Sequence, residues 1–210
     1  MLAVEIRGAV GYLTIDRPDV RNAVVLTGAG KVFSAGADLS SMRRQGAGDA
    51  EENRRNALEM GRLFHRIYDF PKPVVARVPG PAIGGGVGLM TACDVIVAVE
   101  SAFFSFSEVR LGIVPALISP FCIRRLGVAK ARKLFLTGEK ITAPVARELG
   151  LVDEVAAEAD LDDGVNRVLD ALLQVANVGP SVDAAIGGKQ LHCGEQPGAG
   201  VRCDEHFCAG

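Results

Sequence analysis

Two stretches of small residues in this chain could place backbone N–H groups beside a ligand. The first, Ser34–Ala37, follows a short apolar run and a glycine-rich turn; the second, Gly84–Gly86, precedes a predicted short helix. Small residues let a ligand approach the backbone, and N–H groups at a helix N-terminus carry partial positive charge. Together the stretches could donate one N–H each to an oxyanion, although either alone is also compatible with an ordinary turn.

Glu108 is the carboxylate whose surroundings best suit proton transfer. It follows an aromatic-rich predicted strand that contains Phe104 and Phe106, and the apolar run Ile113–Ile118 comes after it. Apolar surroundings disfavour the charged form, so we expect the pKa of Glu108 to be raised toward the range useful for proton transfer. A lone glutamate after a strand is, however, more often a solvated surface residue.

The glycines do not form a nucleotide-binding motif. They lack the Gly-x-Gly-x-x-Gly spacing with its later acidic residue, and no Gly-Lys-Ser/Thr end of a phosphate loop is present. Thiol and imidazole groups that could bind zinc gather near the C-terminus: Cys193, Cys203, Cys208, His192 and His206. No close cysteine pair or spaced histidine pair accompanies them, so we predict neither a metal nor a nucleotide cofactor.

The composition is typical of one soluble globular domain. Of 210 residues, 49% are hydrophobic and 23% charged, and a net charge of −2 gives no long-range attraction to nucleic acid or an anionic membrane. Glu5 and Arg7 interrupt the N-terminal apolar stretch, which argues against a signal peptide. The longest uncharged run, Val78–Cys93, is too short and too rich in proline and glycine to span a bilayer. We therefore expect a cytoplasmic protein with reduced thiols.

Alternating strand and helix patterns predict the α/β class. Predicted strands are Leu2–Arg7, Val10–Ile15, Val24–Thr27, Lys72–Val78, Val95–Val99, Ala102–Phe106 and Leu151–Val155. Predicted helices are Ala50–Tyr68, Val87–Ala92, Pro115–Leu126, Ala143–Leu149 and Leu161–Val178. Gly8 and Ala9 suit a two-residue hairpin turn, and Thr142 and Gly150 suit the start and stop of the helix between them.

The connection between the second and third predicted strands is short. If Val10–Ile15 and Val24–Thr27 were parallel, a crossover of at least about 10–12 residues would have to join them. Only the eight residues Asp16–Ala23 are present. Either the two strands pair differently or a helix-bearing segment is missing after Ala23, and we favour the missing segment.

A series of short motifs, in order along the chain, resembles the enoyl-CoA hydratase/isomerase (crotonase) family. The motifs are Asp16–Ala23, Val24–Gly30, Phe33–Leu39, Ala82–Gly88, Ala92–Asp94, Phe106–Gly112, Leu136–Gly138 and Glu148–Val152. The resemblance covers about residues 3–182 and is specific, because many independent motifs occur in family order. The stretch Val109–Phe121 is similar to bacterial hydratases for branched or methylglutaconyl-type substrates.

The resemblance implies a spiral of ββα turns and a site for a CoA thioester. The thioester oxygen would lie between the backbone N–H groups of Ala37 and Gly85, and Glu108 would transfer the proton. The residues expected against the CoA portion are Arg21, Ala23, Ala35, Ala37, Asp38 and Leu39. Family hydratases commonly use a second glutamate in the first turn after the triple glycine, where this chain has Gly88, although glycine is also usual there in the methylglutaconyl-type subgroup.

We expect three regions: a spiral core over residues 1–155, a partial C-terminal helical region over 156–186, and a disordered or non-native tail over 187–210. Compared with the family, the chain lacks a helix after Ala23 and the normal C-terminal helices. The family forms homotrimers or dimers of trimers through its C-terminal helices, so we expect assembly to be impaired. One face of the last predicted helix, which we expect to be partly uncovered, carries Leu161, Val165, Val168 and Leu172.

Three functions fit these expectations. The first is a hydratase, a lyase of fatty acid metabolism, that adds water across C2=C3 of a 2-enoyl-CoA through an enolate-like intermediate. The second is a double-bond isomerase, for which one carboxylate suffices because it can remove a proton at C2 and return one at C4. The third is a truncated, inactive relative. The hydratase is the main prediction.

Overall fold

A six-stranded mixed sheet forms the centre of the fold. The structure, a computed structural model, describes residues 2–7, 10–15, 23–38 and 49–176. Strand order is β1-β2-β3-β4-β6-β9. The strands are β1 (Leu2–Arg7), β2 (Val10–Ile15), β3 (Val24–Thr27), β4 (Val74–Val78), β6 (Val95–Val99) and β9 (Glu154–Ala156). The last four pair in parallel, whereas β1 and β2 are antiparallel.

Strand β2 pairs antiparallel with β3, with Tyr12 opposite Leu26. Our interpretation of the short connection assumed that these strands were parallel, and this assumption is wrong. Antiparallel neighbours need no crossover, so eight residues are enough to join them. The length of the connection therefore gives no reason of its own to infer a missing segment after Ala23. Residues 16–22 themselves lie outside the described part of the chain.

A second, three-stranded sheet holds together segments that are distant in sequence. Its order is β5-β7-β8, with β5 (Ala82–Ile83) parallel to β7 (Phe103–Ser105) and β8 (Ile141–Thr142) antiparallel to it. Ser34 also forms an isolated parallel bridge with Ala82. This small sheet thus brings both predicted loops of small residues next to the strand that precedes Glu108.

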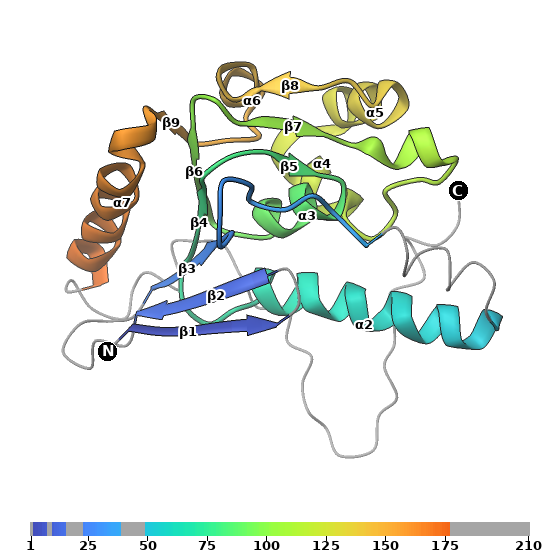
Figure 1. The fold of residues 1–210 in the computed structure, drawn as a ribbon, viewed down its shortest axis with the longest axis horizontal. Helices are drawn as coiled ribbons and strands as arrows, with labels where there is room; N and C mark the ends of the chain where they lie inside the picture. The colour runs from blue at the N-terminus through green and yellow to red at the C-terminus, as the bar shows by residue number, and fades with distance from the viewer. Residues whose placement is uncertain (1, 8–9, 16–22, 39–48, 177–210) are drawn as a thin grey trace, which may run out of the picture.

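Six α-helices surround the sheets in the described part of the chain. They are α2 (Ala50–Tyr68), α3 (Gly85–Thr91), α4 (Ser119–Leu126), α5 (Val128–Thr137), α6 (Ala143–Leu149) and α7 (Leu161–Ala176). Helix α7 lies on one side of the large sheet, and α3 and the small sheet lie on the other (Figure 1). None of these helices is both long enough and apolar enough to cross a membrane.

The apolar face of α7 is largely packed, and only its C-terminal half keeps the partial exposure that we expected. Leu161 and Val165 are buried, and Val168 and Leu172 are partly buried against the same core. Helix α7 contacts β4, β6 and β9, so the face is occupied within the molecule. The predicted tail, with its cysteines and histidines, lies outside the described residues.

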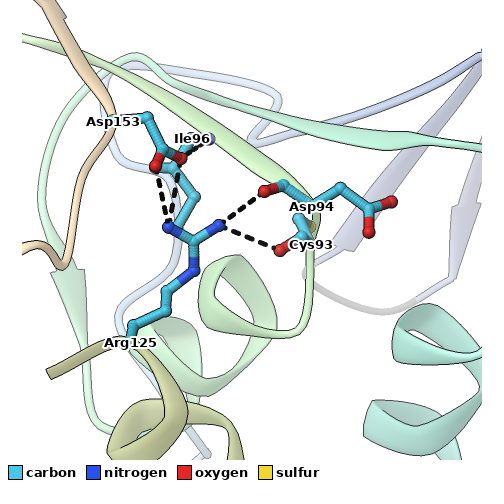
Figure 2. A network of polar contacts seen from close by, with 5 residues as sticks. All are labelled: Cys93, Asp94, Ile96, Arg125 and Asp153. Carbon is cyan, nitrogen blue, oxygen red and sulfur yellow. Dashed lines mark hydrogen bonds and ion pairs between the residues drawn. The ribbon is translucent and has the colours of Figure 1, made fainter. Parts of the chain in front are cut away.

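An arginine network fixes the end of α3 to its neighbours (Figure 2). Arg125 of α4 donates to both carboxylate oxygens of Asp153, at 3.2 and 3.0 Å. Its other terminal nitrogen donates to the carbonyls of Cys93 and Asp94, at 3.1 and 2.8 Å. Asp153 in turn accepts a bond from the N–H of Ile96 at the start of β6. One side chain therefore connects α4, the residues after α3, and the segments that lead into β6 and β9.

Candidate active site

Glu108 lies at the start of a short 3-10 helix, η1 (Ser107–Leu111), directly after β7. Its neighbours Phe104 and Phe106 are almost fully buried, and its own side chain is half-buried. Within the described residues, the buried Oε2 atom of Glu108 has no hydrogen-bond partner. A buried carboxylate oxygen without a partner is costly, which makes it a candidate to meet a ligand or a reacting proton.

Burial also changes the acidity of Glu108. Desolvation raises the pKa of the Glu108 carboxyl above its ordinary value, and a hydrogen bond from its own backbone N–H partly opposes this rise. A higher pKa makes the carboxylate a stronger base and moves the group toward the pH range in which it can both accept and release a proton.

The Glu108 carboxyl lies against the first turn of α3. Its Oε1 atom is only 3.0 Å from the place where a Cβ on Gly84 would stand. Gly84 has a φ of 54°, a conformation that favours glycine, and its N–H donates to the Ser105 carbonyl at 2.9 Å. This bond ties the start of α3 to β7, and it places Gly85, the first residue of α3, close to Glu108.

The loop that contains Ala37 reaches the same place. The N–H of Ile83 donates to the Ser34 carbonyl at 3.0 Å, which aligns the loop with β5. Gly36 has a φ of 91°, and a Cβ there would lie 2.9 Å from the Ile83 carbonyl oxygen and 3.8 Å from the Gly85 nitrogen. The backbone next to Ala37 therefore approaches the N-terminus of α3 as closely as a glycine allows.

The N–H groups of Ala37 and Gly85 donate no hydrogen bond to any described residue. For Gly85 this follows from its position, because the first residue of a helix has no carbonyl one turn before it. A Cβ added to Gly85 would meet no atom within 4 Å, so the space beside this residue is open. Two free donors next to a half-buried carboxylate could stabilise an oxyanion while a proton moves.

The other predicted site residues are only partly described. Ala35, Ala37 and Asp38 are exposed on the loop after β3, where a ligand can reach them. Ala23 is partly buried immediately before β3, and no described contact links it to Glu108. Arg21 and Leu39 lie outside the described residues.

A buried thiol that sequence patterns did not single out lies behind the site. Cys122 of α4 is 3.4 Å from the Thr91 hydroxyl of α3. Burial raises the pKa of the Cys122 thiol to about 12; the Thr91 contact opposes this rise, and the charge of Glu108 adds to it. The thiol stays protonated at neutral pH and cannot act as a nucleophile. In the sequence, Cys122 looks like one more apolar position of a helix.

A cleft of about 530 Å³ lies elsewhere on the molecule. It is lined by Glu100, Pro144, Arg147, Glu148, Val155, Ala156 and Ala157, and shares no residue with the Glu108 site. We place the chemistry at Glu108 because the unpartnered carboxylate oxygen and the two free N–H groups are there. No group of three histidine, cysteine or acidic side chains in the described ranges could hold a metal ion.

Comparisons with known proteins point to one family. The model of the family described as enoyl-CoA hydratase/isomerase matches residues 12–179. A Thermus thermophilus protein, named provisionally as an enoyl-CoA hydratase, is 48% identical over 155 residues, which are 74% of this chain and 60% of that protein. The peroxisomal Delta(3,5)-Delta(2,4)-dienoyl-CoA isomerase of Arabidopsis thaliana is 37% identical over 169 residues, covering 74% of this chain and 59% of the isomerase. The chain thus spans about three-fifths of the length of these relatives.

A solved structure agrees with the sequence comparisons. The crystal structure of an enoyl-CoA hydratase from Shewanella pealeana matches with a TM-score of 0.70 and 37% identity. The match covers 82% of this chain and 73% of that chain. The predicted fold class is therefore confirmed.

Proposed function

Because the chain belongs to the enoyl-CoA hydratase/isomerase (crotonase) family, we propose that it hydrates a 2-enoyl-CoA thioester. The observation that carries the proposal is the buried, unpartnered Oε2 of Glu108 beside the start of α3, where the N–H of Gly85 is free. The Thermus and Shewanella relatives support the same activity by their names.

In the proposed reaction, the thioester carbonyl oxygen accepts hydrogen bonds from the N–H groups of Ala37 and Gly85. Glu108 takes a proton from water as the water oxygen bonds to C3. The electrons of the C2=C3 bond move to the thioester oxygen, which gives an enolate. Glu108 then returns the proton to C2, so that H and OH have been added and the carboxylate is restored. A single oxyanion donor typically contributes about 3–4 kcal/mol to such a step.

We propose that CoA, as part of the substrate, is bound without NAD, FAD or metal. Ala35 and Asp38 are exposed on the loop beside the free N–H groups, which suits contact with the CoA portion. Arg21, Ala23 and Leu39 are proposed as further contacts. We also expect a cytoplasmic location and a role in fatty acid metabolism.

Double-bond isomerisation is the second candidate. It needs only one carboxylate, and position 88, one turn into α3, is Gly88 rather than an acid. The Arabidopsis relative is named as an isomerase. In this reaction Glu108 would remove a proton at C2 of a 3-enoyl thioester and return it at C4.

The test uses the purified protein, dialysed against a chelator, with a 2-enoyl-CoA and a 3-enoyl-CoA. Hydration removes the conjugated enoyl absorbance of the first substrate, and isomerisation creates that absorbance from the second. We expect hydration. Isomerisation alone would support the second candidate. No turnover of either substrate by folded protein would contradict both and support an inactive relative.

A further inference from the structure

The side of α3 next to the site has no room for a second acid. A Cβ added to Gly88 would lie 2.1 Å from Cγ2 and 2.7 Å from Cβ of Ile118, and 3.1 Å from Cε1 of Phe64. Atoms do not approach this closely, so the volume of a residue-88 side chain is already filled. Ile118 and Phe64 are both buried and cannot easily move aside.

Position 88 lies on the same side of α3 as the catalytic groups. It is one helical turn from Gly84, where Glu108 Oε1 stands at 3.0 Å, and three residues from Gly85. Residues three and four apart share a helix face, so a long side chain at position 88 would extend along the face that carries the free N–H. The atoms that fill the side-chain volume at position 88 therefore affect proton transfer at the site as well as helix packing.

The contact between α3 and α4 continues beyond Ile118. Cys122, one turn further along α4, meets Thr91, which is three residues after Gly88. At the other end of this face, Oε1 of Glu108 lies 3.0 Å from the Cβ position of Gly84, one turn before Gly88. The apolar α4 side chains are thus packed directly beside the region in which a proton would move.

We infer that Ile118 limits the site to one carboxylate, because its side chain fills the volume that an acidic side chain at position 88 would need. The packing part of this inference stands on the structure alone, and its catalytic part rests on the proposed function. In the unmodified protein both proton transfers then pass through Glu108, and Ile118 prevents position 88 from carrying a second acid. Shortening Ile118 should open position 88 to a second acid.

The first experiment measures packing and needs no activity. Gly88→Ala is compared in the unmodified protein and in Ile118→Ala, by thermal unfolding. In the unmodified protein the added methyl group overpacks the contact, and we expect Tm to fall on the order of 5 °C. In Ile118→Ala the same change should lower Tm by less than half as much. An equal loss in both backgrounds would overturn the inference.

The second experiment measures chemistry in a protein that carries Glu108→Gln and Ile118→Ala. Gly88→Glu is added to one sample and Gly88→Gln, of matched size, to the other. We expect the glutamate variant to turn over the enoyl thioester at least about tenfold faster than the glutamine variant, because only glutamate can move a proton. Equal rates, or a failure of both variants to fold, would mean that shortening Ile118 does not open the position, and the inference would be wrong.

The two proposals fail in different ways. If the unmodified protein turns over no enoyl thioester, the proposed function fails, and the Tm comparison alone decides whether Ile118 controls position 88. If the unmodified protein is active but both Gly88→Ala losses are equal, only the role of Ile118 is rejected.

Discussion

At the residue scale, the carboxyl of Glu108 combines partial burial with an unpartnered oxygen. Its raised pKa means that the folded state keeps a proton at pH values where the unfolded chain has lost it. The protonated Glu108 side chain therefore contributes to the stability of the folded state. This contribution is fully present below the unfolded-state pKa and is lost as pH rises through the raised folded-state pKa. A glutamine at position 108 stays neutral throughout and avoids this loss.

We therefore predict that Glu108→Gln gains stability relative to the unmodified protein as pH rises. The difference in Tm between variant and unmodified protein should be more positive at pH 7 than at pH 4. Thermal unfolding at both pH values measures it, and Glu59→Gln, at an exposed position of α2, controls for the chemical change. A Tm difference that does not change with pH would show that Glu108 is solvated.

Sequence reasoning could name these site residues but not their contacts. The spacing and the family resemblance pointed to Ala37, Gly85 and Glu108, and the structure brings the loops around all three together; their catalytic roles stay predictions. The close approaches at Gly36 and Gly84, and the filled volume at Gly88, arise between segments distant in the chain. A single sequence gives no measure of such distances.

At the element scale, the loop after β3 depends on the conformation of Gly36. An alanine there would have an unfavourable positive φ, and its Cβ would be 2.9 Å from the Ile83 carbonyl oxygen. The loop would have to move away from α3, and Ala37 with it.

We predict that Gly36→Ala lowers kcat more than it weakens binding of a saturated acyl-CoA. Loss of one oxyanion donor should reduce kcat by about 10²–10³. Gly30→Ala is the control, because a Cβ on Gly30 meets no atom within 4 Å. Unchanged kcat in Gly36→Ala would remove Ala37 from the oxyanion site.

The Arg125 network should contribute to stability rather than to chemistry. The Arg125 side chain is 14% exposed and makes four hydrogen bonds to Asp153, Cys93 and Asp94. We predict that Arg125→Met destabilises the protein by about 2–3 kcal/mol, since several charge-assisted bonds are lost. Lys133→Met breaks the surface pair with Glu139 and should cost less than about 1 kcal/mol. Urea unfolding measures both variants, and equal losses would contradict the assigned role of Arg125.

Several elements were predicted with their observed bounds, whereas helix α5 and the two-residue strands β5 and β8 were not predicted. The periodicity over Ala50–Tyr68 and the β-branched run Val95–Val99 gave the observed bounds of α2 and β6. Strand β5 has only two residues and is held in place by contacts with Ser34 and β7, so no local sequence pattern predicts it. Helix α4 begins at Ser119 with Pro120 in its first turn, four residues later than predicted.

At the scale of the whole molecule, most of the α7 face that we expected to be partly uncovered packs against the core of the same chain. Leu161 and Val165 are buried within the same chain, so they are not available to a second copy. We therefore expect light scattering to give a mass near that of one 22.0 kDa chain. A stable trimer at micromolar concentration would contradict it.

The central claim is that Glu108 moves the proton while the backbone binds the thioester. The most direct measurement compares Glu108→Gln with the unmodified protein in kcat for a 2-enoyl-CoA and in Kd for a saturated acyl-CoA. We predict that kcat falls by about 10²–10⁴ while Kd stays within about threefold, because glutamine keeps the shape but cannot accept a proton. Full activity in the folded Glu108→Gln variant would contradict the claim and assign the proton transfer to another group.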